Sequence, residues 1–160
     1  MSITQDDFRS ALSRFACGVT IVTTKDASGN LHGLTVSAFA SVSLDPPLIL
    51  ICIEKAAGSY HAFHESGLFA VHILSAGQSE LSERFASQIT KKFEGVDMNP
   101  NLDGLPLIAG CVANLECRVR NVCDGGDHSI FIAEVQDIAF HDGDPLVYFR
   151  SDYRELGERK

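Results

Sequence analysis

Residues 33–53 read Gly-Leu-Thr-Val-Ser-Ala-Phe-Ala-Ser-Val-Ser-Leu-Asp-Pro-Pro-Leu-Ile-Leu-Ile-Cys-Ile. Over residues 34–44, two kinds of side chain alternate with a period of two, which predicts a half-buried β-strand, straight or bent. Pro46 and Pro47 then end the ladder of backbone hydrogen bonds, because proline has no N–H to donate. Residues 48–53 are apolar throughout, which is typical of a strand buried on both faces.

One face of the alternating strand carries hydroxyl groups around a single aromatic ring and no charge. Its members are Thr35, Ser37, Phe39, Ser41 and Ser43. Small hydroxyl side chains on a strand are most often merely solvated. A solvent-facing strand usually carries lysine or glutamate, however, so the alternative is a face that hydrogen-bonds a flat, polar ligand.

The composition favours one globular domain over residues 1–160. The chain is 45% hydrophobic and 21% charged, which is enough for one core and argues against disorder. No apolar run approaches the length of a membrane span, and the N-terminus lacks the features of a secretory signal, so we expect a soluble cytoplasmic protein that does not bind membranes. A formal net charge of −8 makes nucleic acid an unsuitable partner.

The cysteines and histidines predict no disulfide frame and no metal site. Five cysteines are an odd number, and no Cys-x-x-Cys pair occurs, so we expect reduced thiols. Cys111, Cys117 and Cys123 recur every six residues on one strand face, which we interpret as packing. His61 and His64 share a helix face at i, i+3, but no third ligand is tied to them by a known spacing.

The remaining periodicities predict about seven strands and three short helices, joined mostly as hairpins. We expect helices over residues 5–15, 60–66 and 76–87, and further strands over residues 19–24, 68–74, 112–122, 128–140 and 146–149. Residues 19–24 are expected to form a hairpin with residues 35–43, and residues 88–110 a long loop. No Rossmann unit is present. The predicted fold is therefore mainly β, an antiparallel, Greek-key-like closed or split β-barrel.

Three motifs in this order resemble the flavin reductase-like family, the small reductase components of two-component flavin monooxygenases. The first is residues 33–39 with residues 41–48, the second is Gly126-Asp127-His128, and the third is residues 145–150 followed by Tyr153. The resemblance covers about residues 8–156. It implies a split β-barrel that binds FMN and works as a homodimer with flavin near the interface. It further implies an NAD(P)H:flavin oxidoreductase that passes reduced FMN or FAD to a separate oxygenase component.

The resemblance also implies which residues contact the flavin. It points to Thr35, Val36, Ser37, Ala38, Ser43, Cys52 and Ser59. Lys55 is placed to meet a phosphate, and its alternative is an ordinary solvated lysine. Arg84, Phe85 and Lys92 match a family pattern of Arg-Phe followed by Lys-Phe, and their alternative is packing and solvation.

Residues of the nicotinamide dinucleotide site follow from the same resemblance. His128 is expected to seat the dinucleotide, against the alternative of an incidental histidine after a hairpin turn. Tyr148 and Tyr153 form an aromatic cluster near the C-terminus, but residues 150–153 read Arg-Ser-Asp-Tyr where the family commonly has Arg-Gly-Tyr. His72 replaces an asparagine common in the family, and either changes the polarity near the flavin or is a satisfied core histidine.

Hydride transfer from nicotinamide to flavin needs no obligatory acid or base, so no catalytic side chain is predicted. A protein that binds or sequesters flavin without fast turnover is the alternative from another class, and a nonenzymatic structural barrel is a third. The sequence leaves open FMN against FAD, NADH against NADPH, whether flavin is substrate or prosthetic group, and the identity of the oxygenase.

Overall fold

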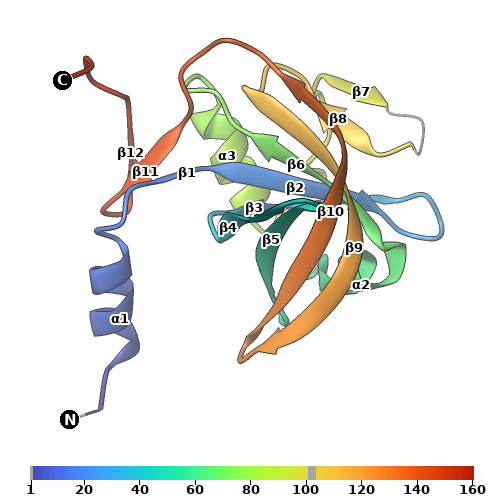
Figure 1. Cartoon of the computed structure of the whole chain (residues 1–160), viewed down its shortest axis with the longest axis horizontal. Helices are drawn as coiled ribbons and strands as arrows, with labels where there is room; N and C mark the ends of the chain where they lie inside the picture. Colours follow the sequence, from blue (N-terminus) through green and yellow to red (C-terminus); the bar gives the residue numbers. More distant parts are fainter. Residues whose placement is uncertain (1, 101–103) are drawn as a thin grey trace.

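The computed structural model describes residues 2–100 and 104–160, and at its centre one antiparallel seven-stranded sheet curls into a barrel (Figure 1). The strands are ordered β3-β2-β6-β9-β10-β5-β4. Their bounds are β2 (Thr20–Lys25), β3 (Leu31–Val36), β4 (Phe39–Leu44), β5 (Pro47–Glu54), β6 (Leu68–Ile73), β9 (Ala113–Gly125) and β10 (His128–Phe140). Because β3 and β4 lie at opposite ends of this order, the barrel is split between them, and the predicted mainly-β split barrel is confirmed.

The predicted single strand over residues 34–44 is wrong in one respect, because these residues belong to two strands. β3 pairs with β2, with Thr20 opposite Val36, as the predicted hairpin requires. The chain then turns at residues 37–38, and β4 pairs with β5 instead, with Phe39 opposite Ile51. The prediction of a buried apolar face does not hold on β4, because Ala40, Val42 and Leu44 are exposed there, whereas Phe39 and Ser43 are partly buried.

The β9–β10 hairpin is the longest pair in the sheet and carries His128 at its tip. β9 ends at Gly125 and β10 begins at His128, so a two-residue turn joins them, in which Gly126 has a φ of 79°. Register shifts next to Ile132 and Val135 bend the hairpin around the barrel. β10 also pairs with β5, which sets His128 opposite Glu54.

The three predicted helices are present, the second with the predicted bounds and the other two shorter than predicted. They are α1 (Gln5–Leu12), α2 (Tyr60–Ser66) and α3 (Ser79–Ala86). Gly67 follows α2 in the left-handed conformation. The predicted loop over residues 88–110 is wrong in part, because β7 (Met98–Pro100) and β8 (Pro106–Ile108) pair within it. In the described ranges, no helix is long and apolar enough to cross a membrane.

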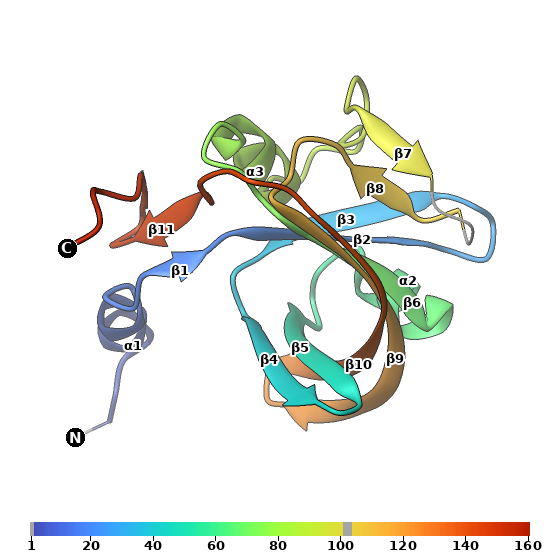
Figure 2. The same cartoon turned by 45° about the horizontal axis from the view of Figure 1, so that its top comes forward.

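A small lobe stands beside the barrel and contains both ends of the chain (Figure 2). It consists of α1 and the three-stranded sheet β1-β11-β12, with β1 (Cys17–Gly18), β11 (Val147–Phe149) and β12 (Asp152–Arg154). Arg150 and Ser151 join the last two strands with φ angles of 50° and 60°, as a two-residue hairpin turn requires. This turn accounts for the departure from the Arg-Gly-Tyr pattern, since it aligns Tyr153 opposite Tyr148.

Two apolar clusters fill the barrel. The larger one contains Phe63, Phe69 and Phe131, and the smaller one contains Phe85 of α3. Cys111 and Cys117 are buried in these clusters, and burial raises the pKa of their thiols to about 11 and about 12. All five cysteines are free thiols. Among the described residues, no group of three or more His, Cys, Asp and Glu side chains could hold a metal.

Gly33 is required where two aromatic rings meet β3. A Cβ at this position would lie 2.7 Å from Phe85 and 2.9 Å from Phe93, whose rings pack edge to face at 5.0 Å. We expect Gly33→Ala to lower the free energy of unfolding by about 1 kcal/mol, because both rings would have to shift. Urea unfolding measures the change, and Gly77→Ala, which adds a methyl where nothing lies within 4 Å, is the control. An equal effect of both substitutions would contradict this account.

Candidate functional site

Four hollows that share lining residues form one groove along β3. We name them the tyrosine hollow of about 210 Å³, the histidine hollow of about 200 Å³, the serine hollow of about 230 Å³ and the outer hollow of about 320 Å³. Thr35 lines the first three. Ser59 and Lys92 line both the serine hollow and the outer hollow. The groove therefore follows β3 and the turn after it. Thr35 and Ser37 of the predicted hydroxyl face line it, whereas Phe39, Ser41 and Ser43, all within the described ranges, line none of the four hollows.

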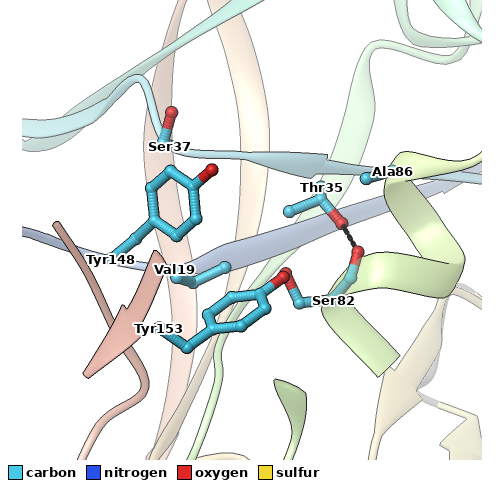
Figure 3. Close-up of a pocket in the computed structure, with 7 residues that line it drawn as sticks. All are labelled: Val19, Thr35, Ser37, Ser82, Ala86, Tyr148 and Tyr153. Carbon is cyan, nitrogen blue, oxygen red and sulfur yellow. Dashed lines mark hydrogen bonds between the residues drawn. The ribbon is translucent and has the colours of Figure 1, made fainter. Parts of the chain in front are cut away.

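The tyrosine hollow lies between the small lobe, β3 and α3 (Figure 3). The Thr35 hydroxyl donates to the backbone oxygen of Ser82 at 2.6 Å, and the Tyr153 hydroxyl donates to Ser82 Oγ at 2.9 Å. The rings of Tyr148 and Tyr153 meet edge to face at 5.4 Å. The hydroxyl of Tyr148 points towards Ser37 (Figure 3). These contacts hold two aromatic rings as one wall of the groove.

The histidine hollow lies where the chain turns between β3 and β4. Ser37, Ala38 and Cys52 line it together with His128. The Cys52 N–H donates to Ala38 O at 3.0 Å, and burial raises the pKa of the Cys52 thiol, so this side chain faces the hollow as a neutral group. The hollow thus combines hydroxyls, a thiol, an imidazole and the carboxylate of Glu54.

A network of charged side chains fixes the hairpin tip that carries His128. His128 Nδ1 lies 2.6 Å from Asp127 Oδ1, and this hydrogen bond lowers the pKa of Asp127. Lys55 donates to Asp124 Oδ1 at 2.5 Å and to Gly126 O at 2.7 Å. The hydrogen bond to Asp124 raises the pKa of Lys55, although solvent screens this exposed pair. Lys55 therefore braces the hairpin tip.

The serine hollow is lined by hydroxyls, one cation and one carboxylate, that of Glu54. Ser59, Ser87 and Gln88 line it beside Lys92. Lys92 Nζ donates to Phe85 O at 2.8 Å and to Gly33 O at 3.4 Å, and burial lowers the pKa of this amine. The ammonium is thus held at the wall of the groove by two backbone oxygens. This set of donors suits an anionic group such as a phosphate.

The structure brings most of the predicted site residues to this groove. Those that line it are Thr35, Val36, Ser37, Ala38, Cys52, Ser59, Phe85, Lys92, His128, Tyr148 and Tyr153. In the described part of the chain, Ser43, Lys55 and Arg84 line none of the four hollows. Ser43 lies on β4, and the Arg84 guanidinium donates to Lys91 O and Glu94 O. Arg84 therefore holds the loop after α3.

Sequence reasoning missed several residues that line the groove. Ser82 and Ala86 face β3 from α3, and their i, i+4 spacing of small residues was a readable signal. Glu54, at the end of β5, and Ala57 and Gln88, in connecting segments, had no such signal, because their position depends on the fold.

His72 is a core histidine away from the groove. Its side chain is fully buried, with Nε2 2.9 Å from Thr23 Oγ1 and Nδ1 3.0 Å from Asn114 Oδ1. Burial lowers its pKa to about 4, so the folded protein holds it neutral. Of the two roles that the sequence left open, the structure supports the satisfied core residue.

His72 is expected to make stability depend on pH. In the unfolded chain the imidazole takes up a proton near pH 6.5, whereas in the folded chain it does so only near pH 4. The stabilisation is therefore complete above about pH 6.5 and is lost as the pH falls towards 4, at about 1 kcal/mol per pH unit. Urea unfolding across this range should show a steeper loss for the wild type than for His72→Gln. Equal slopes would contradict the assignment, and His141→Gln is the exposed control.

Comparison with known proteins gives one matching family, and the similar proteins reported below are named as flavin reductases or reductase subunits. The family model for the flavin reductase like domain matches residues 12–157. The FMN reductase (NADH) SmoA of Agrobacterium fabrum is 45% identical over 141 residues, which cover 88% of this chain and 80% of the relative. The reductase subunit HsaB of a flavin-dependent monooxygenase from Mycobacterium tuberculosis is 36% identical over 96% of this chain and 83% of its own length.

A solved structure with the same architecture has cofactor fragments bound. The NADH:FAD oxidoreductase SgcE6 of Streptomyces globisporus, in complex with NAD and FAD fragments, superposes with a TM-score of 0.91. It is 35% identical, and the match covers 96% of this chain and 93% of that chain.

Proposed function

This chain belongs to the flavin reductase-like domain family, and on that premise we propose that it is an NAD(P)H-dependent flavin reductase whose single domain spans residues 1–160. The observation that carries the proposal is the continuous groove along β3, in which hydroxyls, aromatic rings and a lysine are collected at the split of the barrel. Bound flavin supplies the hydride acceptor, its N5 atom.

The residues of the groove fit what a flavin needs from a protein. Thr35 and Ser37 offer hydroxyls and backbone groups to the polar edge of the ring, and the neutral Cys52 thiol offers a surface beside it. Lys92 and Ser59 provide the cation and hydroxyl that a phosphate needs. We assign no flavin contact to Ser43 or Arg84 in this arrangement, and Lys55 acts through the hairpin tip.

The nicotinamide dinucleotide enters beside the flavin, between the small lobe and the hairpin tip. Tyr148 and Tyr153 supply an aromatic wall, and His128, when protonated, supplies a donor for the pyrophosphate through Nε2. The protein's task is to hold two rings at a distance where hydride passes directly, so no side chain needs to donate or accept a proton in that step.

Steady-state oxidation of NADH and NADPH with and without FMN or FAD tests the proposal, on protein whose visible spectrum has been recorded. Turnover that depends on added flavin is the expected result and establishes a reductase. A flavin spectrum without turnover for any pair would instead favour the flavin-sequestering alternative. Neither turnover nor flavin binding would leave a structural barrel.

We further propose that two copies of this chain assemble as a homodimer. α1 has no buried residue, and its apolar side chains Phe8 and Leu12 are exposed, as is Phe15 beyond its end, at 79%. Leu44, at the end of β4, is 96% exposed. Exposed apolar patches of this kind mark protein interfaces. Sedimentation velocity should give a dimer for the wild type and a monomer for Phe15→Asp, and a monomeric wild type would overturn the proposal.

A separate oxygenase is the proposed consumer of the reduced flavin. HsaB is the reductase subunit of a flavin-dependent monooxygenase, and the match to it covers 96% of this chain. The groove supports the same role here, because some of the residues that line it, such as Ser37, Ala38 and Gln88, are exposed, so a bound flavin would lie at the surface.

A further inference from the structure

The groove does not end at Lys92 but continues into the outer hollow. This hollow is the largest of the four, at about 320 Å³, and shares Gly58, Ser59, Gln88 and Lys92 with the serine hollow. The serine hollow already holds the cation and hydroxyls proposed for a flavin phosphate. A ligand that ends at that phosphate would leave the outer hollow empty.

The chemistry of the outer hollow suits a flat heterocycle next to a phosphate. Leu31, Ile89 and Phe93 give it apolar walls, and Ile89 is 49% exposed. His32 and Thr90 add hydrogen-bonding groups, and no carboxylate lines it in the described ranges. Exposed apolar walls beside convergent polar groups are typical of a ligand site. The ammonium of Lys92 lies where the two hollows join, so a negative charge is favoured at that junction.

The floor of the outer hollow is held in place by contacts made without a ligand. Phe93 packs edge to face on Phe85 at 5.0 Å, and both rings approach Gly33 so closely that no side chain would fit there. His32 Nε2 lies 2.9 Å from Asp26 Oδ2, and this hydrogen bond lowers the pKa of the carboxyl group. A site organised in advance binds with a smaller loss of conformational entropy.

We propose that the outer hollow is a subsite for an adenosine phosphate, and specifically for the adenylate half of FAD. The inference rests on the proposed function and sharpens it, because it names FAD as the preferred flavin. FMN lacks the second nucleotide and gains nothing from Leu31, Ile89 or Thr90. The adenosine of NADH has the same chemistry, so the experiment must separate these two sources.

Flavin binding to the full chain, followed by quenching of flavin fluorescence, tests the proposal. We expect FAD to bind about tenfold more tightly than FMN. Ile89→Asp should lower this FAD/FMN affinity ratio about tenfold, because it replaces an apolar wall with a charge that repels phosphate. The control is Ile138→Asp, an isoleucine of similar exposure (54%) on β10 outside the four hollows, which should leave the ratio unchanged.

Three results would overturn the proposal. Equal wild-type affinities for FMN and FAD would show that the outer hollow adds nothing to FAD. An unchanged ratio in Ile89→Asp would place the adenylate elsewhere. A rise in the KM for NADH in Ile89→Asp with FMN as the flavin would assign the outer hollow to the adenosine of NADH. In each of these cases the proposed reductase function stands, whereas it fails if neither flavin binds and neither is reduced.

Discussion

Replacing Ser37 with leucine is expected to weaken flavin binding by about 100-fold, equivalent to about 2.7 kcal/mol, while the fold stays intact. Ser37 lies at the turn between β3 and β4 and lines both the tyrosine hollow and the histidine hollow. A leucine there would fill the space in which these hollows meet and remove a hydroxyl from the polar edge of the site. The side chain is exposed, so no core packing is lost.

The measurement is a flavin titration followed by fluorescence, together with urea unfolding of the same protein. Ser41→Leu provides the matched control, since Ser41 is an exposed serine of β4 outside the four hollows. If Ser37→Leu binds FMN and FAD as tightly as the wild type, the flavin does not lie in this groove. A loss of binding in both variants would point to general damage to the barrel edge.

Replacing His128 with alanine is expected to raise the KM for NADH by 10- to 100-fold and the KM for flavin by less than about threefold. Hydrogen bonds to charged groups contribute about 1.5–3 kcal/mol, which corresponds to that range for one bond to a pyrophosphate. His128 lines the groove, and its Nδ1 is engaged by Asp127 at 2.6 Å, so Nε2 is the atom left to meet a ligand.

Steady-state kinetics with one substrate varied at a time separates the two KM values. His141→Ala removes an exposed histidine that lines none of the four hollows in the described part of the chain, and should change neither value. Equal increases in both KM values for His128→Ala would indicate that the histidine only shapes the hairpin tip. Asp127→Asn should then reproduce the same pattern.

Local sequence patterns were sufficient for most strands of the barrel, although not for β7 and β8 or for the division between β3 and β4. Alternation with a period of two marked the hydroxyl face that contains Thr35 and Ser37, because side chains of a strand point to opposite sides whatever the strand pairs with. The turn at Gly126 followed from the need for a positive φ between two strands. Proline at the start of β5 set the end of β4 for an equally local reason.

Tertiary contacts decided what each predicted residue does. Lys55 and Lys92 are both lysines in polar surroundings, yet Lys55 is bound by Asp124 on another strand and Lys92 is held by two backbone oxygens within the groove. His72 became a core residue because Thr23 and Asn114, distant in sequence, complete its hydrogen bonds. No spacing along the chain reports these partners.

The sequence by itself determined where apolar and polar side chains alternate and where the chain turns, because both depend on steric rules that act over a few neighbouring residues. Its motifs also determined which family it resembles. Only the tertiary structure decided that one alternating stretch is divided between the two edges of the barrel, which opens the groove at residues 37–38. A strand chooses its neighbours through hydrogen bonds to residues far away in the chain. The groove and its extension past Lys92 exist only once those pairings are made.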